Sequence, residues 1–91
     1  MQSTRYFSEQ VVRKRPYLTA EMCSSVVAAP LRREVQADGR IRQWGRIILP
    51  GEQKPRILRV VTLADGTTLH NAFIDRDFDP NSDPNSDEDR T

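Results

Sequence analysis

Two Asp-Gly dipeptides, Asp38-Gly39 and Asp65-Gly66, interrupt the second half of the chain and constrain its fold more than any other feature. Asp-Gly between stretches of alternating polar and apolar residues is a strong signal for a tight β-hairpin turn. Each dipeptide is therefore expected to close one antiparallel hairpin. The predicted strands lie near residues 31–38, 40–49, 56–64 and 67–75.

Capping residues and prolines delimit two short helices before the first strand. We predict that Ser8 caps the first helix and that Pro16 ends it, since serine accepts a hydrogen bond from a free backbone N–H and proline cannot continue a helix. Thr19 and Pro30 have the same roles for the second helix. The predicted fold class is α+β, with two short N-terminal helices packed on one face of a four-stranded antiparallel meander sheet.

The C-terminal part of the chain differs in composition from the rest. Residues 79–91, DPNSDPNSDEDRT, contain a direct repeat and no large apolar residue, so burial cannot offset their ordering entropy. Residues 1–78 hold 13 Lys and Arg against 8 Asp and Glu, whereas residues 79–91 hold 1 Arg against 5 acids. We therefore predict a single basic domain over residues 1–78 and a disordered acidic tail over residues 79–91.

Several classes of protein are disfavoured by what the sequence lacks. The single cysteine, Cys23, cannot form an intramolecular disulfide, and its place on the apolar side of the second helix predicts a buried, inert thiol. No apolar run is long enough to cross a bilayer, and the first residues lack the apolar segment of a signal peptide. One His and one Cys provide no metal-ligand spacing, and there is no Gly-rich phosphate loop. We expect a cytoplasmic protein with no membrane partner, metal or cofactor.

The stretch RIRQWGRIILP, residues 40–50, concentrates arginines on one side of a predicted strand. At strand spacing one face carries Arg40, Arg42, Trp44, Arg46 and Ile48. Arginine binds phosphate through a planar fork of donors, and an aromatic ring between arginines can stack a base. The first four of these residues are therefore candidate nucleic-acid-binding residues. The alternative is a core tryptophan packed under a helix, with arginine stems lying over it.

Four segments of the chain resemble a known family. They are YFSEQVVRKR, LTAEMCSSVVAAP, DGRIRQW and LRVVTLADGTTLHNAFIDRDF, which together span most of residues 6–78. This order of elements resembles the RelE/ParE-like toxin superfamily, and in particular a group of small domains close to the BrnT ribonuclease toxins. The resemblance implies a curved sheet that holds RNA and an antitoxin protein as a partner. Similar members often carry a His on the first helix, where this chain has Gln10.

The resemblance also implies candidate catalytic residues for RNA cleavage without a metal. Ribonucleases of this kind work largely through positive side chains that orient RNA and stabilise charge on the scissile phosphate. On this basis the candidates are Arg59 and Arg76. His70, the only histidine, is a candidate for a different reason: its ordinary pKa lies near neutral, which suits a general acid or base for a ribose hydroxyl. The alternative for His70 is a half-exposed strand residue that makes one hydrogen bond.

The predicted function is therefore that of a small RelE-like domain that binds RNA or acts as a toxin-type endoribonuclease of a toxin–antitoxin system. The alternatives from another class are a non-catalytic protein-interaction module and a degenerate toxin homologue.

Overall fold

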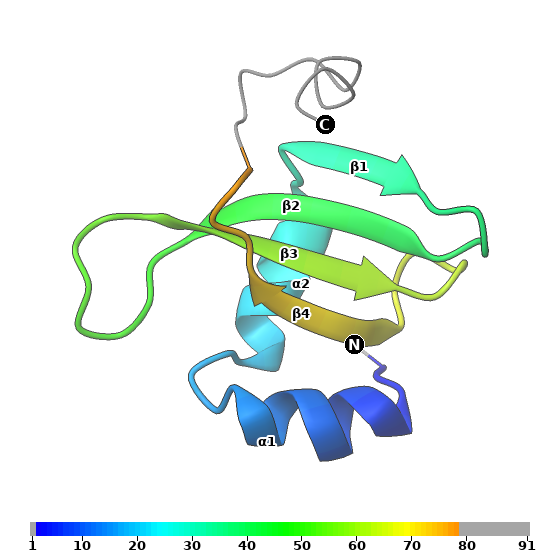
Figure 1. Ribbon diagram of the computed structural model, residues 1–91, viewed down its shortest axis with the longest axis horizontal. Coiled ribbons are helices and arrows are strands. Elements are labelled where there is room, and N and C mark those ends of the chain that lie inside the picture. Colours follow the sequence, from blue (N-terminus) through cyan, green and yellow to red (C-terminus); the bar gives the residue numbers. More distant parts are fainter. Residues whose placement is uncertain (1, 79–91) are drawn as a thin grey trace.

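The computed structural model describes residues 2–78 and confirms the predicted α+β class (Figure 1). Two helices are followed by an antiparallel meander sheet of strand order β1-β2-β3-β4. The predicted disordered tail, residues 79–91, lies outside the described residues. The strands are β1 (Arg32–Val35), β2 (Ile41–Ile47), β3 (Arg56–Thr62) and β4 (Leu69–Ile74).

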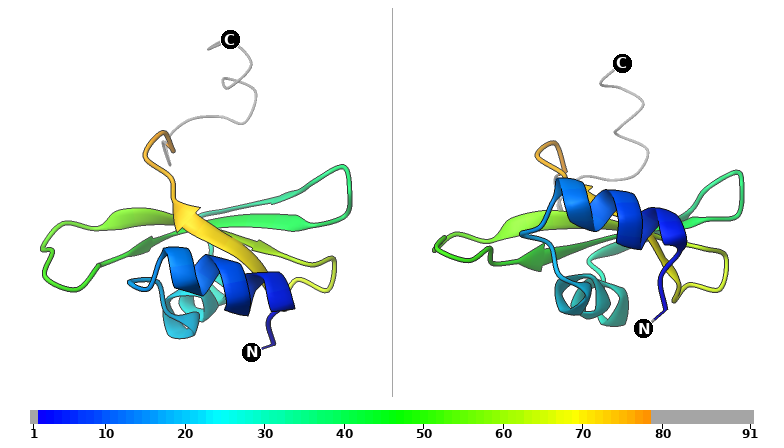
Figure 2. Two further views of the ribbon diagram at one scale, coloured as in Figure 1. Left: turned by 60° about the horizontal axis from the view of Figure 1, so that its bottom comes forward. Right: turned by 90° about the horizontal axis from the view of Figure 1, so that it is seen from below.

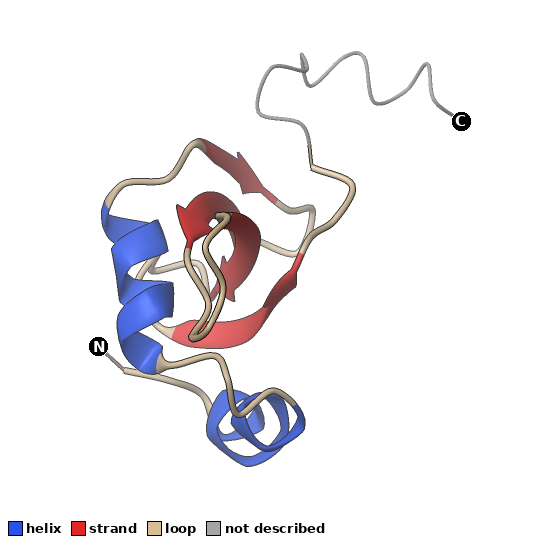
Figure 3. Cartoon of the chain, turned by 90° about the vertical axis from the view of Figure 1, so that its left-hand side faces the viewer, coloured by secondary structure: helices blue, strands red, loops and turns tan. Residues whose placement is uncertain are grey.

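Both helices lie on the same side of the sheet, as predicted (Figure 2). The first is a π-helical turn, η1 (Phe7–Val11), that continues into α1 (Val12–Lys14) and lies beside β4. The second, α2 (Ala20–Ala28), packs on β2 and β3. Thr19 caps α2 as predicted, because its side-chain oxygen accepts the backbone N–H of Met22 at 3.1 Å. Figure 3 shows the strong twist of the sheet beside the two crossed helices.

Both Asp-Gly dipeptides close hairpins, as predicted. The glycine of each turn has a positive φ, 91° at Gly39 and 75° at Gly66, which residues with a side chain rarely adopt. In the second turn the Thr68 hydroxyl and the backbone N–H groups of Thr68 and Thr67 donate to the Asp65 carboxylate. These hydrogen bonds lower the pKa of Asp65 to about 2. The ionised Asp65 carboxylate therefore stabilises the turn.

The first helix begins earlier than predicted, because residues 5 and 6 are already helical, and its cap is Thr4 instead of Ser8. The Thr4 Oγ1 accepts the backbone N–H of Phe7 at 3.2 Å. Ser8 lies inside the helix and donates its hydroxyl to backbone carbonyls of the preceding turn. The prediction was wrong because a contact distant in sequence sets the start of the helix: the Thr4 N–H donates to the carbonyl of Leu69 in β4 at 2.8 Å.

Separate replacement of Thr4 and Ser8 tests which of the two residues caps the first helix. We expect Thr4→Ala to lower the free energy of unfolding by about 1 kcal/mol, the usual effect of losing a helix cap. Ser8→Ala is expected to change it by less than about 0.5 kcal/mol, because Ser8 is an exposed helix residue. Urea denaturation followed by tryptophan fluorescence measures both variants. A larger loss in Ser8→Ala than in Thr4→Ala would contradict the observed cap.

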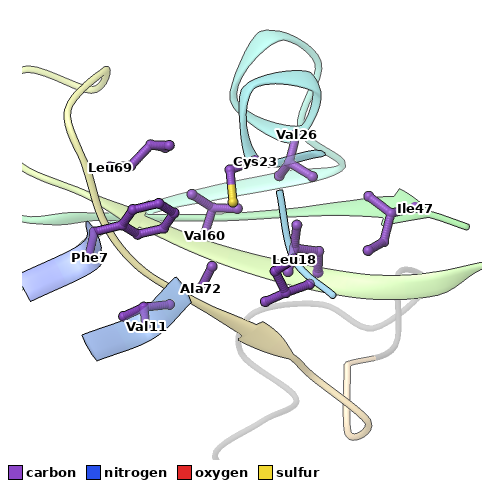
Figure 4. Packing of buried hydrophobic residues seen from close by; sticks show 10 residues of the cluster. Phe7, Val11, Leu18, Cys23, Val26, Ile47, Val60, Leu69 and Ala72 are labelled. Carbon is purple, nitrogen blue, oxygen red and sulfur yellow. The ribbon is translucent and has the colours of Figure 1, made fainter. Parts of the chain in front are cut away.

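The hydrophobic core lies between the sheet and the two helices (Figure 4). Cys23 is fully buried there, as predicted, and burial raises the pKa of its thiol to about 11. Gly45 of β2 lets α2 approach the sheet closely at Val26. The buried cluster contains Phe7, Val11, Leu18, Cys23, Val26, Ile47, Leu58, Val60, Leu69 and Ala72.

One irregularity in β4 changes which side chains face the core. Thr62 pairs with Leu69 instead of His70, because the register between β3 and β4 shifts at this point. Strict alternation would place Leu69 and Phe73 on one side of the sheet. The bulge instead puts Leu69 in the core, fully buried, while Phe73 keeps its place on the opposite side.

Candidate nucleic-acid interface

The face of the sheet that turns away from the helices carries a row of arginines and aromatic residues. Arg32 of β1 lies opposite Trp44 of β2, Trp44 opposite Arg59 of β3, and Arg59 opposite Phe73 of β4. Directly paired residues project from the same face of a sheet. Gly45, next to Trp44, faces α2, so this row lies on the helix-free face. We call these four residues the cross-strand row.

Trp44 is buried in the middle of the cross-strand row, with only 5% of its surface exposed. Its indole Nε1–H donates to the Asp75 carboxylate at 2.9 Å, and its ring stacks on Phe78 with centroids 5.5 Å apart. Residues that follow β4 therefore cover the ring that we predicted to stack a base. The alternative prediction, a tryptophan under a helix, is wrong about the location: the ring is buried on the face without helices.

The arginines of the row are held against aromatic rings. The guanidinium carbon of Arg59 lies 5.5 Å from the ring centroid of Trp44 and 5.0 Å from that of Phe73. The guanidinium carbon of Arg32 lies 5.0 Å from the ring centroid of Phe78. Both geometries are within the range of cation–π attraction. These contacts hold the cationic groups in place along the sheet.

Among the described residues, the helix-free face carries more positive charge than the nearby acidic residues neutralise. Arg42 lies diagonally across from Arg59 on the neighbouring strand. Burial lowers the pKa of Arg59, the charge of Arg42 lowers it further, and Asp75 and Glu34 act in the opposite direction. Within residues 2–78, the buried Nε atoms of Arg42 and Arg59 have no hydrogen-bond partner. Guanidinium groups stay protonated in proteins, so the two charges persist. Arg46, on the same face of β2, is exposed.

The four predicted nucleic-acid-binding residues do not all meet on this face. Arg42, Trp44 and Arg46 share it, as strand spacing indicates. Arg40 precedes β2 in the first hairpin turn, where its guanidinium lies 3.7 Å from the Asp38 carboxylate. Arg40 is thus compensated by an acid, whereas Arg42 and Arg46 form no ion pair with any residue that the structure describes.

The three predicted catalytic residues lie in different places. His70, near the start of β4, has its Nδ1 3.0 Å from the Thr4 hydroxyl oxygen. Burial lowers the pKa of His70, the nearby charge of Arg40 lowers it further, and Asp38 acts in the opposite direction. Arg59 is in the middle of the cross-strand row, and Arg76 follows the other end of β4. Among the described side chains, no hydrogen bond joins His70 to either arginine.

The sequence did not identify half of the residues in the cross-strand row, nor the residues that bury the Trp44 ring. Arg32 and Phe73 complete the row, and Asp75 and Phe78 bury Trp44. The alternating pattern placed Arg32, Phe73 and Asp75 in predicted strands, whereas Phe78 lies beyond the last of them. It contained no signal for the register that aligns them with Trp44.

Comparison of the chain with protein-family models, with curated proteins and with solved structures found no match to any of them. The resemblance to RelE/ParE-like toxins therefore stays a prediction. No helix in residues 2–78 combines the length and apolar character needed to cross a membrane. Over the same residues, no group of three or more His, Cys, Asp or Glu is placed to hold a metal ion.

Proposed function

We propose that this domain binds single-stranded RNA through the helix-free face of its sheet. The observation that carries the proposal is the pair of neighbouring guanidinium groups of Arg42 and Arg59, neither of which forms an ion pair within residues 2–78. A phosphate diester presents acceptor oxygens and a negative charge that match such a pair. Exposed Arg46 extends the same positive surface along β2. The resemblance to RNA-cleaving toxins points to the same class of ligand.

Phosphate contacts, more than base stacking, are expected to supply the affinity. The Trp44 ring is stacked on Phe78 and has almost no exposed surface, so a base cannot reach it unless Phe78 moves. Trp44 acts here as the support that orders Arg59, whose guanidinium lies over its ring. A surface of this kind binds with little sequence preference and with strong dependence on salt.

The test is the salt dependence of RNA binding. We expect Arg42→Ala/Arg46→Ala to lower the slope of log affinity against log salt by roughly 0.7 for each phosphate that is no longer neutralised, or about 1.4 for two. Fluorescence anisotropy of a labelled single-stranded oligoribonucleotide measures the slope. Arg13→Ala/Lys14→Ala is the matched control, because it removes two exposed positive charges from the first helix and leaves the sheet unchanged.

Two results would overturn the proposal. One is the absence of RNA binding by the full chain at low salt. The other is an equal fall in slope for the Arg42/Arg46 pair and the Arg13/Lys14 pair, which would show that only net charge matters.

We propose binding instead of cleavage because His70, Arg59 and Arg76 do not meet in one place. RNA recovered from the binding samples is therefore expected to be intact. Cleavage by the natural chain that disappears in His70→Ala would instead establish the endoribonuclease function, with His70 as its acid or base.

The alternative function, a protein-interaction module, has one surface that suits it. β1 is an outer strand of the sheet, and Val35 at its end is 67% exposed. An outer strand can accept a strand from a partner, such as the antitoxin that the resemblance implies. Slower amide hydrogen exchange in β1 on adding a partner would support this function, and unchanged exchange would argue against it.

A further inference from the structure

A pocket of about 600 Å³ lies at the end of the sheet away from the two Asp-Gly turns. Pockets that bind small molecules are typically about 300–1,000 Å³ in volume. The segment after the first helix, the loop between β2 and β3, and the end of β4 all contribute to its wall. The residues that matter for its chemistry are Arg15, Arg56, Arg76, Tyr17, Leu49 and Phe73.

Two of the three arginines in this pocket have no acidic partner among residues 2–78. Arg56 is paired with Glu52, with Nε 2.9 Å from Oε1, and this hydrogen bond lowers the pKa of the Glu52 carboxyl. The side chains of Arg15 and Arg76 form no ion pair or hydrogen bond with another residue in that range. Within residues 2–78, the pocket therefore presents two positive charges that form no ion pair.

The remainder of the wall suits a flat apolar group. Tyr17 offers an exposed aromatic ring, and Leu49 packs on the edge of the core. Aromatic side chains stack nucleobases regardless of base identity. A ligand that is complementary to the pocket therefore has both a planar ring and a compact anionic group.

We propose that this pocket binds a nucleoside 5′-monophosphate group. A phosphate monoester carries about −1.5 to −2 charges near neutral pH, which matches the two guanidinium groups of Arg15 and Arg76, whereas an internal phosphodiester carries about −1. The base then lies against Tyr17. Arg76, predicted from the resemblance as a catalytic residue, is here a phosphate ligand.

Two kinds of molecule carry a nucleoside 5′-monophosphate group: a free nucleotide and the phosphorylated 5′ end of an RNA strand. A second cavity of about 350 Å³ shares Arg56, Ile74 and Arg76 with the pocket and extends to Phe78, the residue that covers Trp44. An RNA strand that begins in the pocket thus has a path toward the cross-strand row. Only this second source rests on the proposed function, since the free nucleotide needs none of the arginines of the helix-free face.

The test compares the full chain and its variants by calorimetric titration with AMP, adenosine and inorganic phosphate. We expect AMP to bind more tightly than either of the other two. Arg15→Gln/Arg76→Gln is expected to weaken AMP binding by about tenfold or more, because charged hydrogen bonds are removed, and to leave adenosine binding unchanged. The control Arg13→Gln/Lys14→Gln removes the same charge from the outside of the first helix and is expected to bind AMP normally.

Oligoribonucleotides with and without a 5′-phosphate distinguish the sources. Tighter binding of the phosphorylated strand, abolished in Arg15→Gln/Arg76→Gln, would assign the pocket to an RNA end. Equal binding of the two strands together with AMP binding would assign it to a free nucleotide. If AMP binds no better than adenosine, or if the control loses as much affinity as the pocket variant, the inference is wrong. Arg42→Ala/Arg46→Ala is expected to leave AMP binding unchanged, so failure of the pocket and failure of the helix-free face are separable.

Discussion

Replacing Trp44 by alanine is expected to lower the free energy of unfolding by about 3–5 kcal/mol, the usual cost of removing a large buried aromatic side chain. The ring is 5% exposed, it stacks on Phe78, and its Nε1–H bonds Asp75. The substitution therefore leaves a cavity and removes the donor to a half-buried carboxylate. Urea denaturation followed by circular dichroism is the measurement, because Trp44 is the only tryptophan and the variant has no tryptophan fluorescence.

Two further variants separate the parts of this effect. Trp44→Phe keeps an aromatic ring but removes the hydrogen bond to Asp75, and we expect it to cost about 1–3 kcal/mol. Ile48→Ala, at a residue that is 60% exposed, is expected to change stability by less than about 0.5 kcal/mol. A Trp44→Ala variant as stable as Ile48→Ala, with weakened RNA binding, would show that the ring is a stacking platform instead of a support.

Gly45→Ala is expected to lower the free energy of unfolding by about 1–3 kcal/mol through overpacking. A Cβ atom at this position would lie 3.0 Å from Cγ2 and 3.1 Å from Cγ1 of Val26. Val26 is buried on α2 within the core cluster, so it has little room to move away. The methyl group would therefore push α2 away from β2. Chemical denaturation of the variant measures the loss of stability.

A double-mutant cycle tests this explanation directly. Val26→Ala alone should also destabilise the domain, because it leaves a cavity. Combined with Gly45→Ala, the new methyl group fills part of that cavity, so the double variant should be more stable than the sum of the two losses predicts, by at least about 0.5 kcal/mol. Additive losses would mean that the Val26 contact is not the cause. The salt dependence of RNA binding should not change, since Gly45 and Val26 lie on the helix side of the sheet.

The register of the first hairpin is a feature that local sequence signals do not specify. A two-residue Asp-Gly loop would place Arg33 opposite Trp44. The observed loop has three residues, because the Gln36 N–H donates to the carbonyl of Arg40 at 2.7 Å, and Arg32 takes that position. A shift of one residue moves every side chain of a strand to the other face. The cross-strand row thus depends on a loop length that the Asp-Gly dipeptide alone does not specify.

The candidate site was predictable only within one strand. Alternation in β2 correctly placed Arg42, Trp44 and Arg46 on one face, since that pattern follows from backbone geometry. It could not show that Phe78 and Asp75 cover Trp44, because these residues are more than thirty positions away in the chain.

The sequence by itself determined the α+β class, the two hairpins, the cap of α2 and the buried thiol of Cys23, because each depends on residues close together in the chain. Only the tertiary structure decided that Thr4 caps the first helix, that a bulge moves Leu69 into the core, and that Arg15 and Arg76 line one pocket. These features arise where segments distant in sequence meet. Packing and hydrogen bonding between such segments select among local alternatives that are nearly equal in free energy.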